Sequence, residues 1–266
     1  MVSRPPARHA FCAWDGPIAM AHRGFSATGP LRGLENCLPA FAAAVDLGYT
    51  YLETDVRATA DGQLVAFHDE HLDRVTDGRG DLSQLPWSQV RRLRVGGREP
   101  VPTLEEVLGS FPRARFNLDV KTEAALPHLA GVLDRTAAHG RVLVTAFGQR
   151  RRRAALAAVG GREATSASSP GTALALAGAL LRAPFLVRAA VGGVDAVQVP
   201  VRHGGVEVVS ERFVTAVHRA GAQVHVWTVD DPVQIEALLD LGVDGIITDR
   251  ADVLKDVLTR RGQWIG

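Results

Sequence analysis

The sequence predicts an α/β fold, a (β/α)8 TIM-type barrel with a small insertion after the third strand. Short Val- and Ile-rich segments alternate with amphipathic Ala- and Leu-rich segments, which is typical of βα units and a largely parallel sheet. About eight such units fit the chain, and its 266 residues are close to the ~250 typical of these barrels. An open doubly wound sheet is the alternative, but no G-x-G-x-x-G sequence follows the first predicted strand.

The elements are read from these alternating segments. Strands are expected at 17–22, 50–57, 63–68, 115–121, 141–146, 163–167, 194–199, 223–228 and 243–247. Helices are expected at 36–47, 103–110, 123–139, 149–159, 172–182, 210–220, 231–241 and 250–260. The segment "TLEEVL" begins with Thr103 at the cap position and an acid three residues later, which predicts a capping box.

One connection is too short to contain a helix. Segments 50–57 and 63–68 are joined by "TADG", whose Asp-Gly pair is typical of a tight turn, whereas a parallel pair needs a crossover of a dozen or more residues. We therefore expect an antiparallel hairpin with its turn centred near residues 60–61. That register would set Glu53 opposite His68, with Asp55 on the same face.

The chain is expected to form one barrel domain over residues 1–266, with an N-terminal extension at 1–16 and an inserted segment at 70–101. The insertion, which contains "DGRGDLSQLPWSQVRR", is expected to be a loop with a short helix. The most apolar window, residues 172–187, is shorter than the ~20 residues of a membrane span. It is expected to be a buried helix followed by a loop, with a lipid-facing helix near a substrate entrance as the alternative.

Composition and charge exclude several classes of protein. The net charge of +1 gives no reason to expect nucleic acid as a partner. Cys12 and Cys37 fit no zinc-ligand spacing and are too few for a disulfide framework, which favours a reducing, cytoplasmic location. The N-terminus lacks the layout of a signal peptide, and no transmembrane segment is expected.

Polar side chains gather where the predicted strands end, and in a barrel these ends face a common mouth. They are His22, Arg23, Glu53, Asp55, His68, Asp119, Lys121, Trp227 and Asp230. Three carboxylates in a partly dry mouth repel one another, and oxygen-only ligation suits a hard ion such as Mg²⁺ or Ca²⁺. Two histidines can serve as general acid and base, and the Arg and Lys favour an anionic substrate such as a phosphate. These parts suit hydrolysis of a phosphoryl ester.

The chain resembles the glycerophosphodiester phosphodiesterase family. The resemblance is carried by "AHRG", then "ENCLPAFAAAVDLGYTYLETDVRATADGQLVAFHDEHLDRVTDGRG", then "FNLDVKTE", "DAVQVP" and "VHVWTVDD". It covers nearly the whole chain from about residue 17, and the insertion at 70–101 matches the family's inserted segment. The resemblance implies a (β/α)8 barrel that uses a divalent metal to hydrolyse glycerophosphodiesters to glycerol 3-phosphate and an alcohol.

The resemblance also implies residue roles. The acid–base pair would be His22 and His68. The metal ligands would be Glu53, Asp55 and Asp119. The substrate-binding residues would be Arg23, Lys121, Trp227 and Asn36, of which Asn36 would orient a ligand or the substrate. The family usually has Glu at the position of Asp119, so this shorter side chain would reach the metal through water or alter the metal preference.

Several alternatives stay open. A lysophospholipase D-like hydrolase of lipid phosphodiesters would make use of the apolar window at 172–187, and peripheral lipid contact would follow from it. A non-catalytic barrel that binds phosphodiesters is opposed by the complete acid–base pair. A metal-dependent isomerase or aldolase would need a substrate carbonyl, for which a phosphate-binding Arg and Lys are no evidence. The pattern predicts neither the head group nor the oligomeric state.

Overall fold

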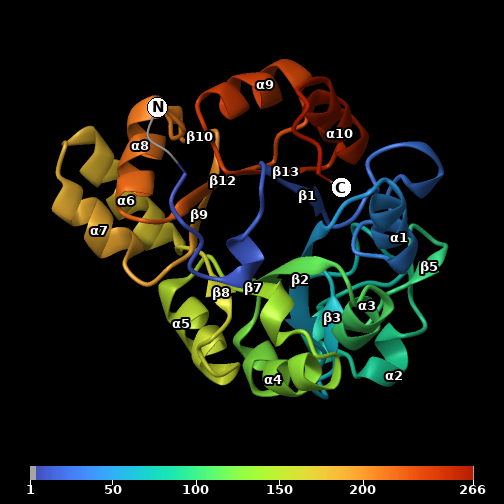
Figure 1. Cartoon of the computed structure of the whole chain (residues 1–266). Helices are drawn as coiled ribbons and strands as arrows, with labels where there is room; N and C mark the ends of the chain where they lie inside the picture. Colours follow the sequence, from blue (N-terminus) through green and yellow to red (C-terminus); the bar gives the residue numbers. More distant parts are fainter. Residues whose placement is uncertain (1–3, 266) are drawn as a thin grey trace.

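Eight parallel strands form a barrel surrounded by helices in the computed structural model, which describes residues 4–265 (Figure 1). The strands are β1 (Ile18–His22), β2 (Tyr51–Ala58), β6 (Arg115–Val120), β7 (Val142–Thr145), β8 (Ala164–Thr165), β9 (Ala196–Pro200), β12 (Gln223–Trp227) and β13 (Gly245–Thr248). Around the barrel they follow the order β8-β7-β6-β2-β1-β13-β12-β9. The predicted barrel is confirmed, and each of these strands lies within two residues of its predicted range.

The barrel is joined least extensively between β8 and β9. These strands share one parallel bridge, between Ser166 and Ala196. Two flanking backbone hydrogen bonds support it, from Asp195 N to Thr165 O at 2.8 Å and from Ala167 N to Ala196 O at 2.9 Å. By contrast, β2 and β6 pair over Tyr51–Val56 and Arg115–Val120. The barrel is therefore nearly closed. The least extensive strand pairing is between β8 and β9, and the chain forms helices between these two strands.

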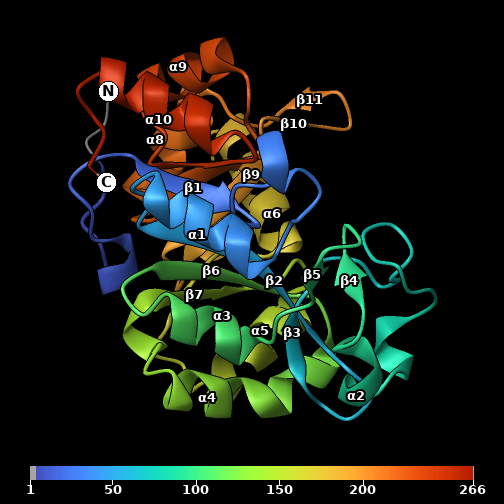
Figure 2. The same cartoon turned by 90° about the vertical axis from the view of Figure 1, so that its right-hand side faces the viewer.

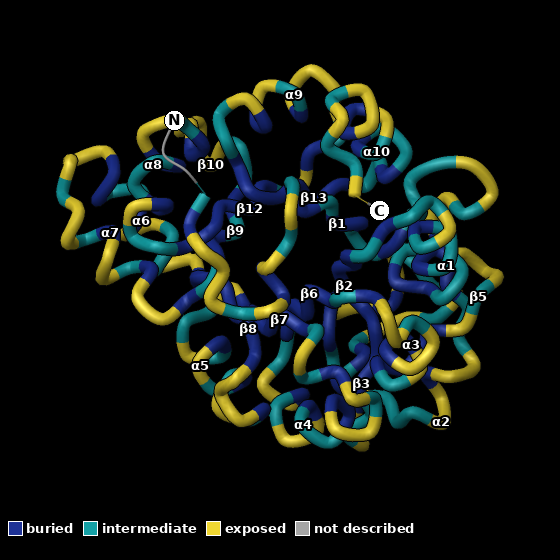
Figure 3. The backbone as a smooth tube through the Cα atoms, viewed as in Figure 1, coloured by how far each residue is buried: buried dark blue, intermediate teal, exposed yellow. Residues whose placement is uncertain are grey.

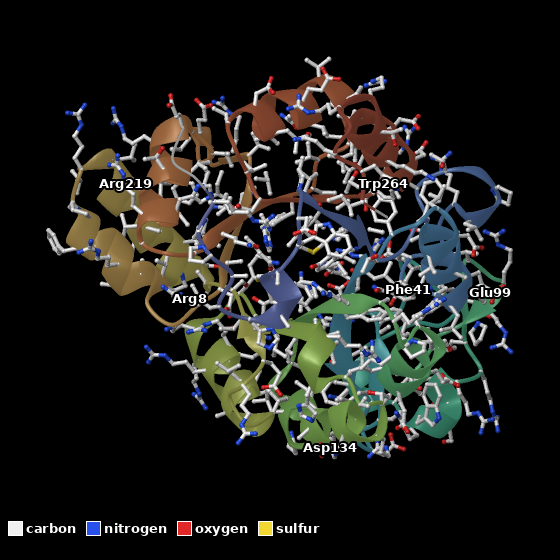
Figure 4. The ribbon with its side chains drawn as sticks, in the orientation of Figure 1. Arg8, Phe41, Glu99, Asp134, Arg219 and Trp264 are labelled. Atoms are coloured by element: carbon white, nitrogen blue, oxygen red, sulfur yellow. The ribbon has the colours of Figure 1, made fainter. Side chains whose placement is uncertain are left out.

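The main core lies between the strands and the outer helices, where apolar side chains from both pack together. Figure 3 shows the strands as buried and the outer faces of the helices as exposed. Phe41 on α1 (Leu38–Asp46) packs edge-on against Phe116 of β6, with ring centroids 6.0 Å apart. In Figure 4, Phe41 lies inside the molecule, whereas the charged Asp134 and Arg219 lie at its periphery.

The outer helices follow the predicted order with one addition. They are α1, α3 (Leu104–Ser110), α4 (Leu126–Arg135), α5 (Gln149–Ala158), α6 (Ser169–Leu180), α7 (Pro184–Val191), α8 (Glu211–Arg219), α9 (Pro232–Asp240) and α10 (Ala251–Arg260). The prediction of one buried helix and a loop over 172–187 was wrong, because α6 ends at Leu180 and a second helix starts at Pro184. Arg182, with φ of 55°, makes the turn between them. Within residues 4–265, no helix is both long and apolar enough to cross a bilayer.

The predicted antiparallel hairpin is confirmed, but its predicted register was wrong by one residue. β2 pairs with β3 (Leu64–Ala66) through Val56–Ala66, Arg57–Val65 and Ala58–Leu64. The turn is closed by bonds from Thr59 N to Gln63 O and from Gly62 N to Thr59 O, both 3.0 Å, which centres it on Asp61. Glu53 therefore lies beyond the paired residues and does not face His68 across the hairpin.

The insertion after β3 forms a small layer at the carboxyl end of the barrel. It contains the 3₁₀ helix η3 (Leu82–Gln84), α2 (Trp87–Val90) and an antiparallel pair of β4 (Arg94–Val95) and β5 (Glu99–Pro100). Figure 2 shows these elements together on the right, on the side toward which β1 points. Its apolar residues share one buried cluster with Val65 and Phe67, which anchors the insertion to the hairpin.

The N-terminal segment covers the opposite end of the barrel. The 3₁₀ helix η1 (Ala10–Cys12) buries Phe11 against Tyr51, with ring centroids 5.2 Å apart. Arg115 donates hydrogen bonds to the carbonyl oxygens of Ala10 and Ala13 at 2.9 and 3.0 Å. Because this end is filled by side chains, only the carboxyl end of the barrel presents the strand-end residues to a substrate.

Candidate active site

A cavity of about 510 Å³ lies at the carboxyl ends of the strands. The resemblance assigns roles to nine residues. The cavity lining includes eight of them, namely His22, Arg23, Glu53, Asp55, His68, Asp119, Lys121 and Trp227. The ninth, Asn36, lies directly behind Asp55. The structure therefore brings together groups that are spread over most of the sequence, as expected where parallel strands end at one rim.

Strand register sets which charged groups are neighbours. His22 is aligned with Glu53 between β1 and β2, and Asp55 is aligned with Asp119 between β2 and β6. Glu53 and Asp55 are two residues apart on one strand, so they point to the same face. The parallel sheet thus holds the acids together. The hairpin was predicted to gather the acids and His68, but it contributes only the segment that leads to His68.

His22 is oriented by a carboxylate on each side. Its Nδ1 lies 2.6 Å from Asp249 Oδ1, and its Nε2 lies 3.7 Å from Glu53 Oε2. Burial lowers the pKa of His22, but the charges of Glu53 and Asp249 outweigh burial and raise the pKa above its ordinary value. Because Asp249 engages Nδ1, the other ring nitrogen remains to exchange a proton in the cavity.

His68 is held in a similar way from the insertion side. Its Nδ1 lies 2.6 Å from Asp69 Oδ1. Asp69 also accepts a bond from Arg74 Nε at 2.6 Å, and Arg74 in turn donates to both oxygens of Glu35. The hydrogen bonds of Arg74 hold the pKa of Asp69 well below its ordinary range, despite partial burial. Asp69 therefore remains charged and fixes one nitrogen of His68.

Asp55 is the most heavily paired of the acids. Its Oδ1 lies 2.9 Å from Lys121 Nζ, and its Oδ2 lies 3.0 Å from Arg23 Nε and accepts from Asn36 Nδ2 at 2.9 Å. Burial would raise the pKa of Asp55, but Lys121 and Arg23 outweigh burial and lower it. Asn36 also accepts from Thr54 Oγ1 at 2.8 Å, which fixes its amide. Asn36 thus orients a site carboxylate, and its role in binding the substrate stays a prediction.

The loop after β1 is strained where it forms the site. Arg23 and Asn36 have φ of 54° and 60°, a region that costs energy for residues other than glycine. Arg23 N donates to Glu53 O at 3.0 Å, and Asn36 N donates to Arg23 O at 2.9 Å. At Gly24, with φ of 84°, a Cβ would lie 2.7 Å from the Ala40 carbonyl carbon. The bent loop lets Arg23 reach both Asp55 and Glu35.

Glu53 and Asp119 are short of positive charge. Burial, reinforced by the neighbouring Asp55, raises the pKa of Glu53 to about 7. Burial also raises the pKa of Asp119, although Lys121 Nζ lies 2.5 Å from its Oδ2. Its Oδ1 is buried without a hydrogen-bond partner. The charged part of the cavity lining, which we call the floor, therefore holds carboxylate oxygens that lack a cation.

The donor set fits a hard divalent cation. Three carboxylates, Glu53, Asp55 and Asp119, face two fixed cations, so the floor carries one excess negative charge, and a phosphodiester anion adds another. One divalent ion balances both, and carboxylate oxygens are its preferred ligands. Within residues 4–265, no group of three His, Cys, Asp or Glu side chains converges on a common point, and Lys121 bridges Asp55 and Asp119.

A second part of the cavity lining, which we call the wall, is apolar. Phe147, which follows β7, meets Trp227 edge-on with ring centroids 5.8 Å apart, and Lys121 Nζ lies 5.4 Å from the centre of the Phe147 ring. Leu176 of α6 and Val208 extend this wall. A charged floor beside an apolar wall suits a substrate with an anionic centre and a less polar arm.

The family is decided by comparison with known proteins. The model of the glycerophosphoryl diester phosphodiesterase family matches residues 22–253. The chain belongs to this family. A Mycobacterium tuberculosis protein named probable glycerophosphodiester phosphodiesterase 2 is 45% identical over 260 residues, which are 96% of each chain. The glycerophosphodiester phosphodiesterase of Caldanaerobacter subterraneus is 25% identical over 268 residues, covering 92% of this chain and 99% of its own.

Solved structures agree with the fold of this family member. An Oleispira antarctica phosphodiesterase, solved with the product sn-glycerol-3-phosphate, superposes with a TM-score of 0.75 at 22% identity, over 92% of this chain and 97% of its own. The glycerophosphodiester phosphodiesterase of Agrobacterium tumefaciens gives a TM-score of 0.71 at 24% identity, over 90% and 98% of the two chains.

Sequence reasoning missed one residue of this glycerophosphodiesterase site and misplaced another. Asp249 was not among the predicted site residues, yet it follows β13, directly before Arg250, the cap residue of α10, and its carboxylate holds His22. Its position at the end of β13, next to β1 in the barrel, is the signal that could have found it. Asp230, expected at the mouth, instead accepts bonds from Thr248, Asp249 and Arg250 and shapes that turn.

Proposed function

We propose that this chain hydrolyses glycerophosphodiesters to glycerol 3-phosphate and an alcohol, with His22 and His68 as the acid–base pair. The single observation that carries the proposal is that both imidazoles line one cavity, each with Nδ1 held by a carboxylate at 2.6 Å. Membership of the family and the product complex of the Oleispira relative support the substrate class.

Arg23 and Lys121 would bind the phosphate. Burial lowers the pKa of Lys121, but Asp55 and Asp119 outweigh it, so the ammonium stays charged across the physiological range. A phosphate oxygen would take one of the hydrogen bonds that Lys121 now gives to the carboxylates. Arg23 is held by Asp55 and Glu35, so its guanidinium is presented to the substrate in a fixed orientation.

Glu53, Asp55 and Asp119 would hold a divalent cation, Mg²⁺ or Ca²⁺, which when bound supplies charge neutralisation at the phosphate. The unpartnered Asp119 Oδ1 and the raised pKa of Glu53 support this assignment. For Asp119 to contribute both oxygens, Lys121 would have to leave it, and binding of the phosphate by Lys121 would favour that exchange.

One histidine would take the proton of the attacking oxygen, and the other would protonate the leaving alkoxide. The attacking oxygen is that of water or of the substrate's own glycerol hydroxyl. Attack by the glycerol hydroxyl would expel the alcohol and leave a cyclic phosphate, which water would then open to glycerol 3-phosphate. A substrate analogue lacking the neighbouring hydroxyl would be cleaved only by direct attack of water.

The test is release of glycerol 3-phosphate from a panel of glycerophosphodiesters after chelation, with Mg²⁺, Ca²⁺ and Mn²⁺ added back separately. We expect no turnover with chelator and recovery with at least one ion. Binding of a glycerophosphodiester without release of product, with metal supplied, would overturn the proposal in favour of a non-catalytic binding protein.

The apolar wall favours a second candidate, hydrolysis of lipid phosphodiesters in the manner of a lysophospholipase D. Phe147, Leu176 and Trp227 offer an apolar path away from the phosphate-binding residues. Comparing kcat/KM for glycerophosphocholine with that for a lysophospholipid distinguishes the two.

We place the enzyme in the cytoplasm, since Cys12 and Cys37 are buried thiols in separate positions and not a disulfide.

A further inference from the structure

The turn between α6 and α7 exposes large apolar side chains away from the active site. We call residues 180–188 the hairpin tip. Leu180, Leu181 and Phe185 are 52%, 72% and 69% exposed, and they follow one another closely in the chain. In Figure 1, α6 and α7 extend outward from the barrel on the left, and Figure 3 shows their outer end as exposed. Such a grouping is unlike single exposed apolar residues, which need no explanation.

The charge around the hairpin tip has one sign. Residues 164–194 contain no Asp or Glu, while Arg182 and Arg188 are exposed. Some exposed arginines elsewhere on the surface pair with acids, as Arg135 does with Glu105. Within residues 4–265, neither Arg182 nor Arg188 has a carboxylate within ion-pair distance. The tip therefore presents apolar side chains flanked by free positive charge.

The hairpin tip is held rigidly. α6 and α7 pack closely at Gly178, where a Cβ would lie 2.9 Å from Val187 N. The turn is closed by bonds from Leu181 N to Ala177 O at 2.9 Å and from Ala183 N to Gly178 O at 2.8 Å. The backbone of the tip is thus already ordered before a partner binds, which lowers the entropic cost of association.

We propose that the hairpin tip docks this protein on an anionic phospholipid surface. Leucine and phenylalanine side chains that enter the interface, with arginines beside them, are the combination that binds the headgroup region of negatively charged membranes. A second copy of the chain fits less well, because a twofold contact through the tip would bring the arginines of both copies into one interface that has no acid from either tip.

The tip and the catalytic cavity lie at different ends of one helix. Thr172, Ala173 and Leu176 of α6 line the cavity, and the tip follows at the carboxyl end of the same helix. The docking itself does not depend on the proposed chemistry, since it is a property of the tip alone.

The test is sedimentation of the full chain with vesicles of pure phosphatidylglycerol and, separately, of pure phosphatidylcholine. We expect the wild-type protein to bind phosphatidylglycerol much more tightly than phosphatidylcholine. The double variant Leu181→Asp/Phe185→Asp should bind roughly ten-fold or more weakly, because it removes apolar insertion and adds repulsion. Arg182→Gln and Arg188→Gln should each weaken binding about five-fold and remove part of the salt dependence.

Two matched controls change similar residues elsewhere. Val233 on α9 is 73% exposed and Arg113 is an exposed arginine before β6, so Val233→Asp and Arg113→Gln should bind vesicles as the wild type does. Turnover of a water-soluble substrate should be unchanged in all variants, which separates loss of docking from loss of folding or of chemistry. Equal binding to both lipids, no binding, or binding insensitive to the tip variants would overturn the proposal. A wild-type dimer that the tip variant dissociates would overturn it in favour of self-association.

Discussion

The two sides of the cavity are built by different means. The charged floor comes from residues 22–121, on β1, β2, β6 and the hairpin, and its groups are fixed by hydrogen bonds and ion pairs. The apolar wall comes from residues 146–228, after β7 and β12 and on α6, and it is fixed by packing. Asp55 contacts three polar partners, whereas Phe147 is 52% exposed and touches Trp227 by an edge.

The floor and the wall therefore have different tasks, the chemical step and the selection of the leaving alcohol. Groups on the floor hold one another's charge and orientation, so a change in one alters its neighbours and should act on the chemical step. Groups on the wall contact few polar partners, so a change there should act on which alcohol the substrate carries. We therefore expect floor variants to lower kcat and wall variants to alter KM according to the leaving group.

The largest effect should come from removing a floor imidazole. His22→Ala or His68→Ala should lower kcat about 10²–10⁴-fold, because each removes one proton-transfer partner. The matched control is His203→Ala, since His203 also lines the cavity but lies on the wall side, on the exposed pair β10 (Arg202–His203) and β11 (Val206–Glu207). Steady-state rates with unchanged circular dichroism check this. Full turnover by His22→Ala would remove the acid–base assignment.

A change directly beside the floor can tell which histidine is the acid. Asp249→Asn keeps an acceptor for His22 Nδ1 but removes one of the two carboxylate charges, after that of Glu53, that raise the pKa of His22, so that pKa should fall. The rate should drop about ten-fold or more. If His22 is the general base, the acidic limb of the pH–rate profile moves to lower pH. If His22 is the general acid, the basic limb moves to lower pH.

The control for this change is three residues away. Asp252 pairs with Arg250 on the surface and does not touch His22, so Asp252→Asn should leave both limbs in place. A profile for Asp249→Asn that matches the wild type would mean that Asp249 only shapes the turn.

The same division explains what could be predicted from the sequence. The barrel followed from the alternation of strand and helix patterns, and the floor residues followed from polar groups at strand ends and from motifs of the family. Asp249 was missed because it lies at the end of the last strand, and only closure of the barrel brings it to β1. The hairpin register failed because the position of a turn is fixed by backbone bonds, here at Thr59, that no residue pattern specifies to one residue.

The wall could not have been predicted in the same way. Leu176 and Phe147 look like ordinary core residues in the sequence, and only packing decides that they line a cavity. The window at 172–187 was misjudged because Pro184 can begin a helix as readily as end one. Its exposed tip follows from the break at Arg182, which composition does not reveal.

A smaller floor effect tests the shorter acid at position 119. Asp119→Glu extends the carboxylate by one methylene and so should strengthen its hold on a divalent ion, lowering the metal concentration for half-maximal activity about ten-fold. Asp119→Asn should raise that concentration instead. The measurement is activity against added Mg²⁺ or Ca²⁺ after chelation. Equal metal dependence in all three proteins would show that Asp119 only pairs with Lys121.

The smallest effect should come from the wall. Trp227→Ala removes one of the two rings of the wall, against which an apolar leaving alcohol would pack. An aromatic contact is worth about 0.5–1.5 kcal/mol, so KM for a glycerophosphodiester with an apolar leaving alcohol should rise about three- to ten-fold. KM for glycerophosphoglycerol, whose leaving alcohol is polar, should stay nearly constant, and kcat should change little for either substrate.

Phe147→Ala supplies the matched variant. If the two rings act as one surface, Trp227→Ala/Phe147→Ala should cost less than the two single changes together, by the energy of their contact. Lys121 lies over the Phe147 ring, so a fall in kcat on Phe147→Ala alone would mean that the wall also positions the phosphate-binding lysine. Equal rises in KM for polar and apolar substrates would end the division between floor and wall, because leaving-group selection would then not reside in these rings.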